Sequence, residues 1–503
     1  MKRKAIIIMT AAFLAGSGLF AQDVNDVLRY SQIFYTGTAR FMSMGGAFTA
    51  LGGDMSTFSQ NPAGIGLFRS SEISFTPQLF YIRTTSNAPG LSKDYLYNFN
   101  VGQIGIVSRL LSSANTSGLI SLNVGYSFNK TSNLNSSIRI EGINNSSSMA
   151  DSWADQSFGY TRNELLDNAP FGYMASKVFL IDTLSGSNTE YGTVYSQYGD
   201  NPPSKYGQTM RRTISNTGYT GEHAFSIGGN YSNKIFFGAT LGINTLRFSD
   251  RYQHLEKVDY TLASGFKDFM YTQYTENQGT GISFKLGAIV KPVESVRVGL
   301  AFQSPIYYRI HAYLTDDITA NFEGFPTDEY SLQPLRYNYA LSTPFRALAG
   351  VAIQIKKIAL LSADYEFVDY STARFSQTGD NYDYTEKNLA IKNTLKPTSN
   401  IRVGGEFRLN KMYFRGGYGY YGKAYKLGEL NDNLDYSSFS LGLGFREQNL
   451  NIDLGYSNTG NSESYILYNI YSATAPNNLE SVTSNLNIRK NLFAVTVGYK
   501  FGY

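Results

Sequence analysis

The chain has 503 residues, of which 16% are charged and 15% aromatic, with 40 Tyr, 33 Phe, 48 Gly and no Cys. Its mean hydropathy of −0.25 excludes a bundle of membrane helices, and so few charges are not typical of a disordered chain. The lack of Cys excludes disulfides, thiolate metal sites and a cysteine nucleophile. Length alone suggests three or four domains, but the excess of Tyr, Phe, Gly, Ser, Asn and Thr favours strands and turns.

The first 21 residues have the features of an export signal. Lys2, Arg3 and Lys4 precede an apolar run over 5–14, which is too short to span a membrane as a helix. A short N-terminal anchor helix is the alternative. Removal of these three basic residues lowers the formal net charge from +4 to +1. Since no concentrated basic stripe is visible, we predict an exported protein that does not bind nucleic acid.

Residues beyond position 22 show the alternation of barrel strands. Apolar side chains recur at every second position, with small or polar residues between them, in runs such as Phe493, Val495, Val497 and Tyr499. Lipid-facing barrel strands alternate in this way. No apolar run approaches the roughly 20 residues of a spanning helix. A membrane form must therefore be a closed barrel, because open strand edges leave backbone groups unpaired in lipid.

The predicted fold class is an all-β, 14-stranded antiparallel transmembrane β-barrel over residues 72–503. Short and long connections alternate, and every long connection follows an odd-numbered strand, so both chain ends are expected at the end with the short turns. Pro77 lies within strand one, where a closed barrel has no free edge, so we expect a bulge or a later start there. The long connections are expected at 144–212, 256–275, 313–339, 377–395 and 467–483.

Residues 22–71 lack this alternation and are predicted to form an N-terminal hatch, or plug, inside the barrel. Glycines allow tight turns, and a proline stops a helix while holding the preceding residue extended. A lid or linker outside the barrel is the alternative. The hatch motif comprises Gly45, Gly46, Asn61, Pro62, Ala63 and Gly64. Five apolar side chains are candidate ligand contacts or the core of the plug itself: Phe41, Met42, Met44, Phe48 and Phe58.

Strands nine to eleven place charged residues on the face opposite their apolar residues. Neighbouring strands would then bring opposite charges together inside the lumen, where buried charges must be paired. This predicted charge network either anchors the hatch through salt bridges or forms a polar conduction track. Its members are Asp364, Glu366, Arg402, Glu406 and Arg415.

These motifs together resemble the FadL/TodX-type outer-membrane transporters of hydrophobic compounds. Residues 45–48 and 61–64 look like the family's hatch, and residues 297–305 and 414–418 resemble two of its barrel strands. The long 144–212 loop and the segment just before Asn61 depart from the family pattern. The resemblance implies fourteen strands and a sideways exit through a kinked strand three. Our strand three covers 117–143, and its pattern breaks at 129–130, where a kink or a plain bulge would fit.

The resemblance implies a passive transporter in the bacterial cell outer membrane, with no cofactor, no metal and no catalytic residue. Its cargo would be a hydrophobic small molecule, with long-chain fatty acids the first candidate, bound in an apolar lumen site and released by hatch rearrangement. Expected partners are this cargo and outer-membrane lipids, around a monomeric barrel. The only histidines, His223, His254 and His311, show no spacing to a nucleophile. Alternatives are a surface haem receptor and a binding or secretion-associated scaffold on the same barrel.

Overall fold

The computed structural model describes residues 23–113, 117–195, 206–262, 264–356, 358–379, 382–470 and 482–502. The predicted signal segment and the terminal Tyr503 lie outside the described residues. Within these ranges, no helix is long and apolar enough to cross a membrane.

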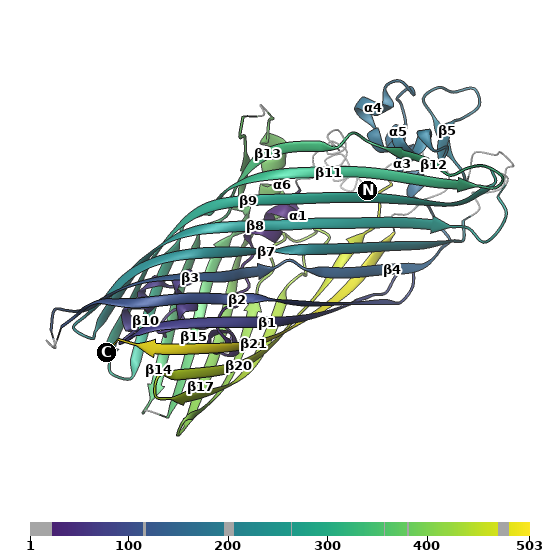
Figure 1. Cartoon of the computed structure of the whole chain (residues 1–503). Coiled ribbons are helices and arrows are strands. Elements are labelled where there is room, and N and C mark those ends of the chain that lie inside the picture. The colour runs from purple at the N-terminus through teal and green to yellow at the C-terminus, as the bar shows by residue number, and fades with distance from the viewer. Residues whose placement is uncertain are drawn as a thin grey trace, which may run out of the picture.

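A closed antiparallel barrel of 14 strands forms the body of the molecule (Figure 1), and the predicted fold class is confirmed. The first strand, β1 (Ser71–Ser86), pairs with the last, β21 (Thr483–Phe501), so the sheet closes on itself. The other strands, four of them in two pieces, are β2 (Ser92–Ser112), β3 (Leu119–Asn133) with β4 (Ser136–Asn144), β7 (Gln208–Tyr231), β8 (Ile235–Lys257), β9 (Phe266–Val293), β10 (Val296–Gln303) with β11 (Tyr307–Phe322), β13 (Leu335–Ser342) with β14 (Arg346–Ile355), β15 (Ala359–Asp369) with β16 (Arg374–Ser376), β17 (Pro397–Leu409), β18 (Met412–Tyr421), β19 (Tyr436–Glu447) and β20 (Leu450–Ile466).

Shorter elements lie before the barrel and in the connections at one of its ends, here called the long-loop end; the opposite end is the short-turn end. An insert between β4 and β7 contains α3 (Met149–Ser157), α4 (Leu165–Asn168), α5 (Pro170–Lys177), β5 (Ile181–Thr183) and β6 (Tyr191–Thr193). Other connections contain β12 (Asp328–Ser331), η4 (Tyr370–Thr372) and α6 (Thr385–Thr394). The N-terminal segment, residues 23–70, contains α1 (Val24–Ser31), α2 (Ala39–Ser43), η2 (Met55–Ser59) and η3 (Pro62–Leu67).

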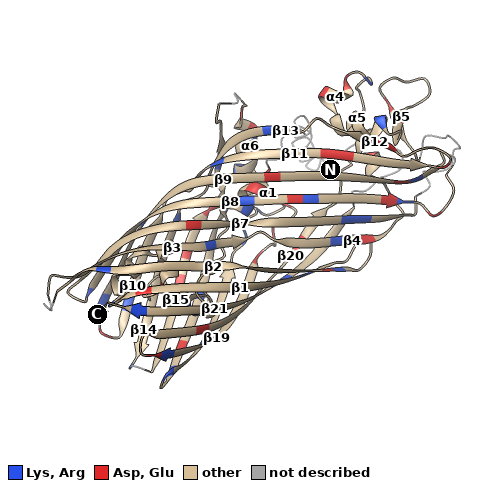
Figure 2. Cartoon of the chain, in the orientation of Figure 1, with Lys and Arg blue, Asp and Glu red and all other residues tan. Residues whose placement is uncertain are grey.

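The strands turn their apolar side chains outward, as their alternation predicts. On β21, Phe493, Val495, Val497 and Tyr499 are 40–50% exposed, whereas the intervening Ala494 and Thr496 are buried. Charged residues are most frequent toward the two ends of the barrel and on the insert, and further ones lie along β7, β8 and β9 between these ends (Figure 2). The exposed outward positions of strands such as β21 are apolar, as a lipid-facing barrel wall requires.

The bulge expected near Pro77 is present. The register between β1 and β2 shifts between Thr76 and Pro77, and Gly102 of β2 is the extra residue that has no partner. On the other side of β1, neither Thr76 nor Pro77 is paired with β21. A proline has no N–H to donate to a ladder. A regular strand would therefore leave an acceptor on the neighbouring strand unpaired at Pro77. The interruption of the ladder at this residue avoids that.

Several strands begin earlier than the alternation predicts. Strand six was expected over 276–290, but β9 starts at Phe266, and β7 starts at Gln208, inside the expected 144–212 loop. The reason is that these strands project past the apolar band toward the insert, so their inner faces pack against other protein. Phe269 and Tyr271 of β9, for example, contact Trp153 of α3 with ring centroids 5.5 and 5.6 Å apart. Lipid-type alternation is therefore lost while the strand continues.

Strand three is interrupted just after residues 129–130, where the sequence pattern breaks and a kink or a plain bulge was expected. Its pairing with β7 shifts between Lys130 and Ser132, and the strand is interrupted between Asn133 and Ser136. The ladder between β2 and β3 stops at Gln103 and Asn129. Among the described residues, 92–101 of β2 have ladder partners on β1 alone, and Gly102 has none. We call this stretch of the wall, where no backbone ladder joins β2 to the β3–β4 break, the window.

Among the described residues, the side-chain hydrogen bonds across this window lie near the long-loop end. Ser137 Oγ donates to Asp94 Oδ2 at 2.6 Å, and the Glu141 N–H donates to Ser92 Oγ at 3.1 Å. Below them, the outward residues Tyr97 and Phe99 of β2 are 69% and 72% exposed. These are high values for the wall, because no neighbouring strand covers their flank.

We predict that the closing seam can be trapped by a disulfide, because the native chain has no Cys to interfere. Leu79 and Phe493 are directly opposite each other in the β1–β21 register, and such pairs have Cα atoms about 4.5–5.5 Å apart, within disulfide reach. The double variant Leu79→Cys with Phe493→Cys should oxidise almost completely in the folded barrel, as read by gel shift. The pair Leu79→Cys with Val497→Cys, offset by four residues, should not; equal cross-linking of both pairs would contradict this closure.

Candidate functional site

The N-terminal segment contacts strands from widely separated parts of the barrel. Helix α2 contacts β18, β19, β20 and β21, whereas η3 contacts β3, β7, β8 and β9. Most of the segment's side chains are buried. The segment thus packs against strands on both sides of the barrel, and its role as a plug stays a prediction.

Wall glycines allow the backbone of this segment to lie directly against the strands. At each of six inward-facing glycines, an added Cβ would collide with an atom of the N-terminal segment, such as Met44 O at Gly404 or Thr49 O at Gly299. The predicted site does not include these glycines. The sequence did contain a sign of them, because each glycine occupies an inner-face position of an alternating strand. The six are Gly238, Gly287, Gly299, Gly404, Gly417 and Gly442.

The predicted hatch-motif residues shape the turns that make this fit. Asn61 caps η3 by accepting from the Ala63 N–H at 3.1 Å, and its Nδ2 donates to Thr49 O at 2.6 Å. Pro62 occupies the first turn of η3, where its missing N–H is not needed. Gly45 and Gly46 have φ values of 64° and 72°, which L side chains rarely adopt.

The five predicted apolar residues lie in three packed clusters. Phe41, Met44 and Phe48 pack together with Tyr35 and Leu51. Phe58 packs with Met55, Ile65 and Phe68, and Met42 belongs to the largest cluster. None of the five lines the main cavity described below. Their role as ligand contacts stays a prediction, and their observed surroundings are those of a protein core.

The predicted charge network is divided among three places. Glu366 binds Arg402 at 2.8 Å and also Arg346. Asp364 lies in the same strand but accepts from the N–H and hydroxyl of Thr49, at 2.9 and 2.7 Å. Sequence reasoning did not identify Arg346, which is the first residue of β14.

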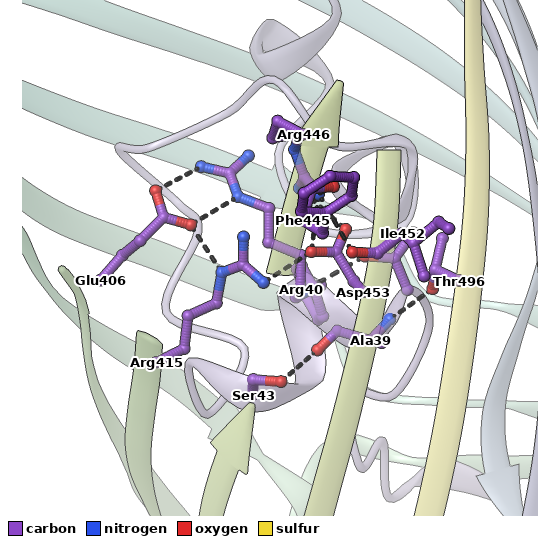
Figure 3. Close-up of polar contacts among 12 residues, drawn as sticks. Ala39, Arg40, Ser43, Glu406, Arg415, Phe445, Arg446, Ile452, Asp453 and Thr496 are labelled. Atoms are coloured by element: carbon purple, nitrogen blue, oxygen red, sulfur yellow. Dashed lines mark hydrogen bonds and ion pairs between the residues drawn. The ribbon is translucent and has the colours of Figure 1, made fainter. Parts of the chain in front are cut away.

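Glu406 and Arg415 belong to a second network that includes the N-terminal segment (Figure 3). Glu406 accepts from Arg415 at 2.6 Å and from Arg40 of α2 at 3.1 Å. Arg415 also binds Asp453 at 2.7 Å, and Asp453 binds Arg446 at 2.8 Å. Arg40, which the sequence-based network lacks, therefore links α2 to the wall through charge.

A cavity of about 1010 Å³, here called the main cavity, lies between the N-terminal segment and the long loops. Its lining comes from α1, the strand-three break, the inner faces of β7–β9, the insert, and residues near 430 and 465. Because α1 lines this space, the described chain starts on the long-loop side of the barrel, and the expectation that both chain ends lie at the short-turn end is wrong for the described N-terminal helix. Apolar members of the lining include Leu28, Phe34, Ile138, Trp153, Phe171 and Leu467.

The insert covers this cavity and is fastened by Glu256 of β8. Glu256 accepts from Ser148 Oγ at 2.6 Å, the Met149 N–H at 2.8 Å and Tyr195 Oη at 3.1 Å. At the start of α3, Asp151 accepts from the Ser148 N–H at 2.7 Å. Burial raises the pKa of Asp151 to about 7. The insert is thus held to the barrel by polar contacts at the helix start.

Each of the three histidines considered as a haem ligand contacts other side chains. His254 lies between Arg212 and Glu256, 3.0 Å from the latter. His223 hydrogen-bonds with Tyr126 at 2.9 Å, and His311 lies against Asn338. Only His254 is fully buried, and it takes part in the contacts beneath the insert.

Comparison with solved structures identifies the fold. A Pseudomonas aeruginosa FadL homologue matches with a TM-score of 0.55 and 13% identity, over 94% of this chain and 100% of that one. The P. putida toluene transporter TodX matches with a TM-score of 0.51 and 12% identity, over the same shares. The CymD monoaromatic hydrocarbon channel matches with a TM-score of 0.50 and 11% identity, also over 94% and 100%. No protein-family profile and no curated protein sequence matches the chain. The chain therefore has the fold of the FadL and TodX barrels.

We predict that the wall glycines are needed for seating of the N-terminal segment. Gly417→Ala would direct a methyl group at Gly45, whereas Gly416→Ala in the same strand would find only ordinary contacts at 3.9 Å. Overpacking of this kind costs about 1–3 kcal/mol. We expect Gly417→Ala to lower the unfolding midpoint in urea and to speed hydrogen exchange over residues 40–50, with Gly416→Ala unchanged. Equal effects of the two substitutions would contradict this contact.

Proposed function

We propose that the chain is a passive outer-membrane transporter of hydrophobic compounds. The observation that carries the proposal is the position of the cavity. It lies beneath the long loops and above the N-terminal segment, and residues 132–136 at the strand-three break form part of its lining. A bound compound would therefore already lie beside the window in the wall.

The cavity suits a largely apolar guest in size, and part of its lining is apolar. Its volume is that of a pocket for a ligand the size of a drug molecule or larger. Each methylene removed from water contributes about 0.8 kcal/mol, so a water-filled pore would offer such a compound no comparable gain. Related barrels are described as carrying toluene or monoaromatic hydrocarbons. The sequence resemblance adds long-chain fatty acids as the first candidate cargo.

Sideways release would need no energy source. The bilayer buries an alkyl chain about as well as an apolar cavity does, so a guest that moves from the cavity into lipid loses little of its burial free energy. Passage downward through the barrel would instead require the guest to enter water on the short-turn side. The window between β2 and strand three supports the sideways route.

We further propose that the N-terminal segment acts as the hatch and that its movement is coupled to the window. The Phe34 N–H donates to Thr131 O at 3.1 Å, and Thr36 Oγ1 donates to Lys130 O at 2.8 Å. Both acceptors lie where strand three loses its regular register. A shift of residues 34–36 would therefore change the hydrogen bonding of the strand that borders the exit.

We predict that locking the window stops transport without stopping binding. Asp94→Cys with Ser137→Cys replaces two side chains that now hydrogen-bond across the window, and a short, cleavable bis-thiol reagent should bridge them. Uptake of a radiolabelled C12 alcohol by cells making this variant should fall at least fivefold on bridging and recover on reduction.

The matched control is the cross-linked Leu79→Cys with Phe493→Cys pair, which lies at a seam that is already closed. Its uptake should not change on oxidation. Normal uptake by the bridged window variant would contradict the sideways route. Equal uptake by cells with and without the protein would contradict the transport function itself.

A further inference from the structure

Three residues that line the main cavity each have a buried polar side-chain atom without a hydrogen-bond partner among the described residues. These atoms are Asn133 Nδ2, Asn216 Oδ1 and Asp250 Oδ1. Asn133 is only 8% exposed, so water in the bulk does not reach it freely. Buried polar groups are ordinarily hydrogen-bonded. A rotation of these side chains toward the cavity would let a guest with polar atoms of its own, or ordered water, supply the missing partners.

These atoms belong to one part of the wall. Asn216 of β7 and Asp250 of β8 are directly opposite each other in the register, and Asn216 Nδ2 donates to Ser136 Oγ at 3.0 Å, beside the strand-three break. Asn133 ends β3 at the same break. On the facing helix α1, Arg29 stacks 4.5 Å over Phe248, two residues from Asp250. The polar patch thus lies on the cavity wall nearest the window.

The charges of the lining are predominantly negative. Five carboxylates line the cavity, those of Asp23, Asp26, Asp250, Glu429 and Glu463, against the two cations of Arg29 and Lys490. Arg29 is already in an ion pair with Asp26. Among the described residues, Asp250 forms neither a salt bridge nor a side-chain hydrogen bond, and its Oδ1 is buried. Lys490, which forms no salt bridge among these residues, lies 5.9 Å over the Phe34 ring. An incoming carboxylate would thus find one ammonium group against five carboxylates.

Farther along β8 and β9, toward the long loops, the lining is apolar and aromatic. Trp153 and Phe171 of the insert pack against Tyr271, with ring centroids 5.6 and 6.1 Å apart. A guest with one polar end and one apolar end would match both parts of the cavity at once.

Building on the proposed transport function, we propose that the cavity selects amphiphiles whose head group donates hydrogen bonds and carries no negative charge. The head group lies against Asp250, Asn216 and Asn133, and the alkyl or aryl body lies beneath Trp153 and Phe171. Alcohol and ammonium head groups share this donor chemistry. A free fatty-acid carboxylate does not, so this inference narrows the cargo away from the class that the sequence resemblance suggests.

The test uses the only Trp of the chain as a reporter, because Trp153 lines the cavity. The full-length barrel in lipid nanodiscs is titrated at pH 7.5 with dodecylamine, dodecanol and dodecanoate, each below its micelle concentration, and Trp fluorescence is followed. We expect the amine and the alcohol to bind at least tenfold more tightly than the carboxylate. Asp250→Asn should reduce the advantage of the amine over the alcohol at least fivefold.

The matched control is Glu294→Gln, which removes a carboxylate from the exposed turn between β9 and β10, away from the cavity. It should leave all three affinities unchanged. Dodecanoate binding as tight as that of the alcohol would overturn the head-group inference and leave transport standing. If none of the three compounds changes the fluorescence and none is taken up by cells, the proposed function itself is overturned. If Asp250→Asn fails to assemble, the affinities of the unaltered protein for the amine, the alcohol and the carboxylate still test the head-group inference.

Discussion

A strand that crosses a bilayer must pair its backbone groups within the protein, and this requirement governs where the barrel can depart from a regular ladder. Two of its departures are at Pro77 and at the break in strand three. Both places border the N-terminal segment. Gln78, next to the proline, donates to Gly37 O at 3.2 Å, and Thr131 O accepts from the Phe34 N–H. The segment thus supplies partners where the wall loses its own.

The wall and the N-terminal segment also depend on each other for packing and charge. Inward glycines remove the side chains that would otherwise keep the two backbones apart. Asp364 has hydrogen bonds to Thr49, and Arg40 shares Glu406 with Arg415. Withdrawing the segment would leave these buried groups with fewer partners, at a cost of several kcal/mol for a buried charge. Small rearrangements, such as a shift of residues 34–36, are therefore more accessible than ejection of the whole segment.

The sequence predicts the barrel well because lipid imposes a two-residue period on every spanning strand, as at Phe493–Tyr499. The sequence predicts strand ends poorly where strands extend beyond the apolar band. The inner face of β9, for example, packs there against α3, so the alternation of a lipid-facing strand is lost. For the site, apolar residues such as Phe41 and Phe48 stand out locally, yet they pack against each other. The cavity residues Phe34, Trp153 and Asp250 come from distant segments that only the closed barrel brings together, so no local motif could have indicated them.

The window and the cavity have the same two-sided chemistry. On β2, the inward Asn98 and Asn100 hydrogen-bond with each other at 2.9 Å, whereas Tyr97 and Phe99 point outward. Across the window, the break in strand three brings Asn133 and Asn135 to the inner edge. An amphiphile that leaves sideways would therefore keep its head group among amides while its alkyl body passes aromatic rings into lipid. Because amide groups can exchange hydrogen bonds with a donor head group step by step, no single contact along this route would have to be strong, which is what passive release requires.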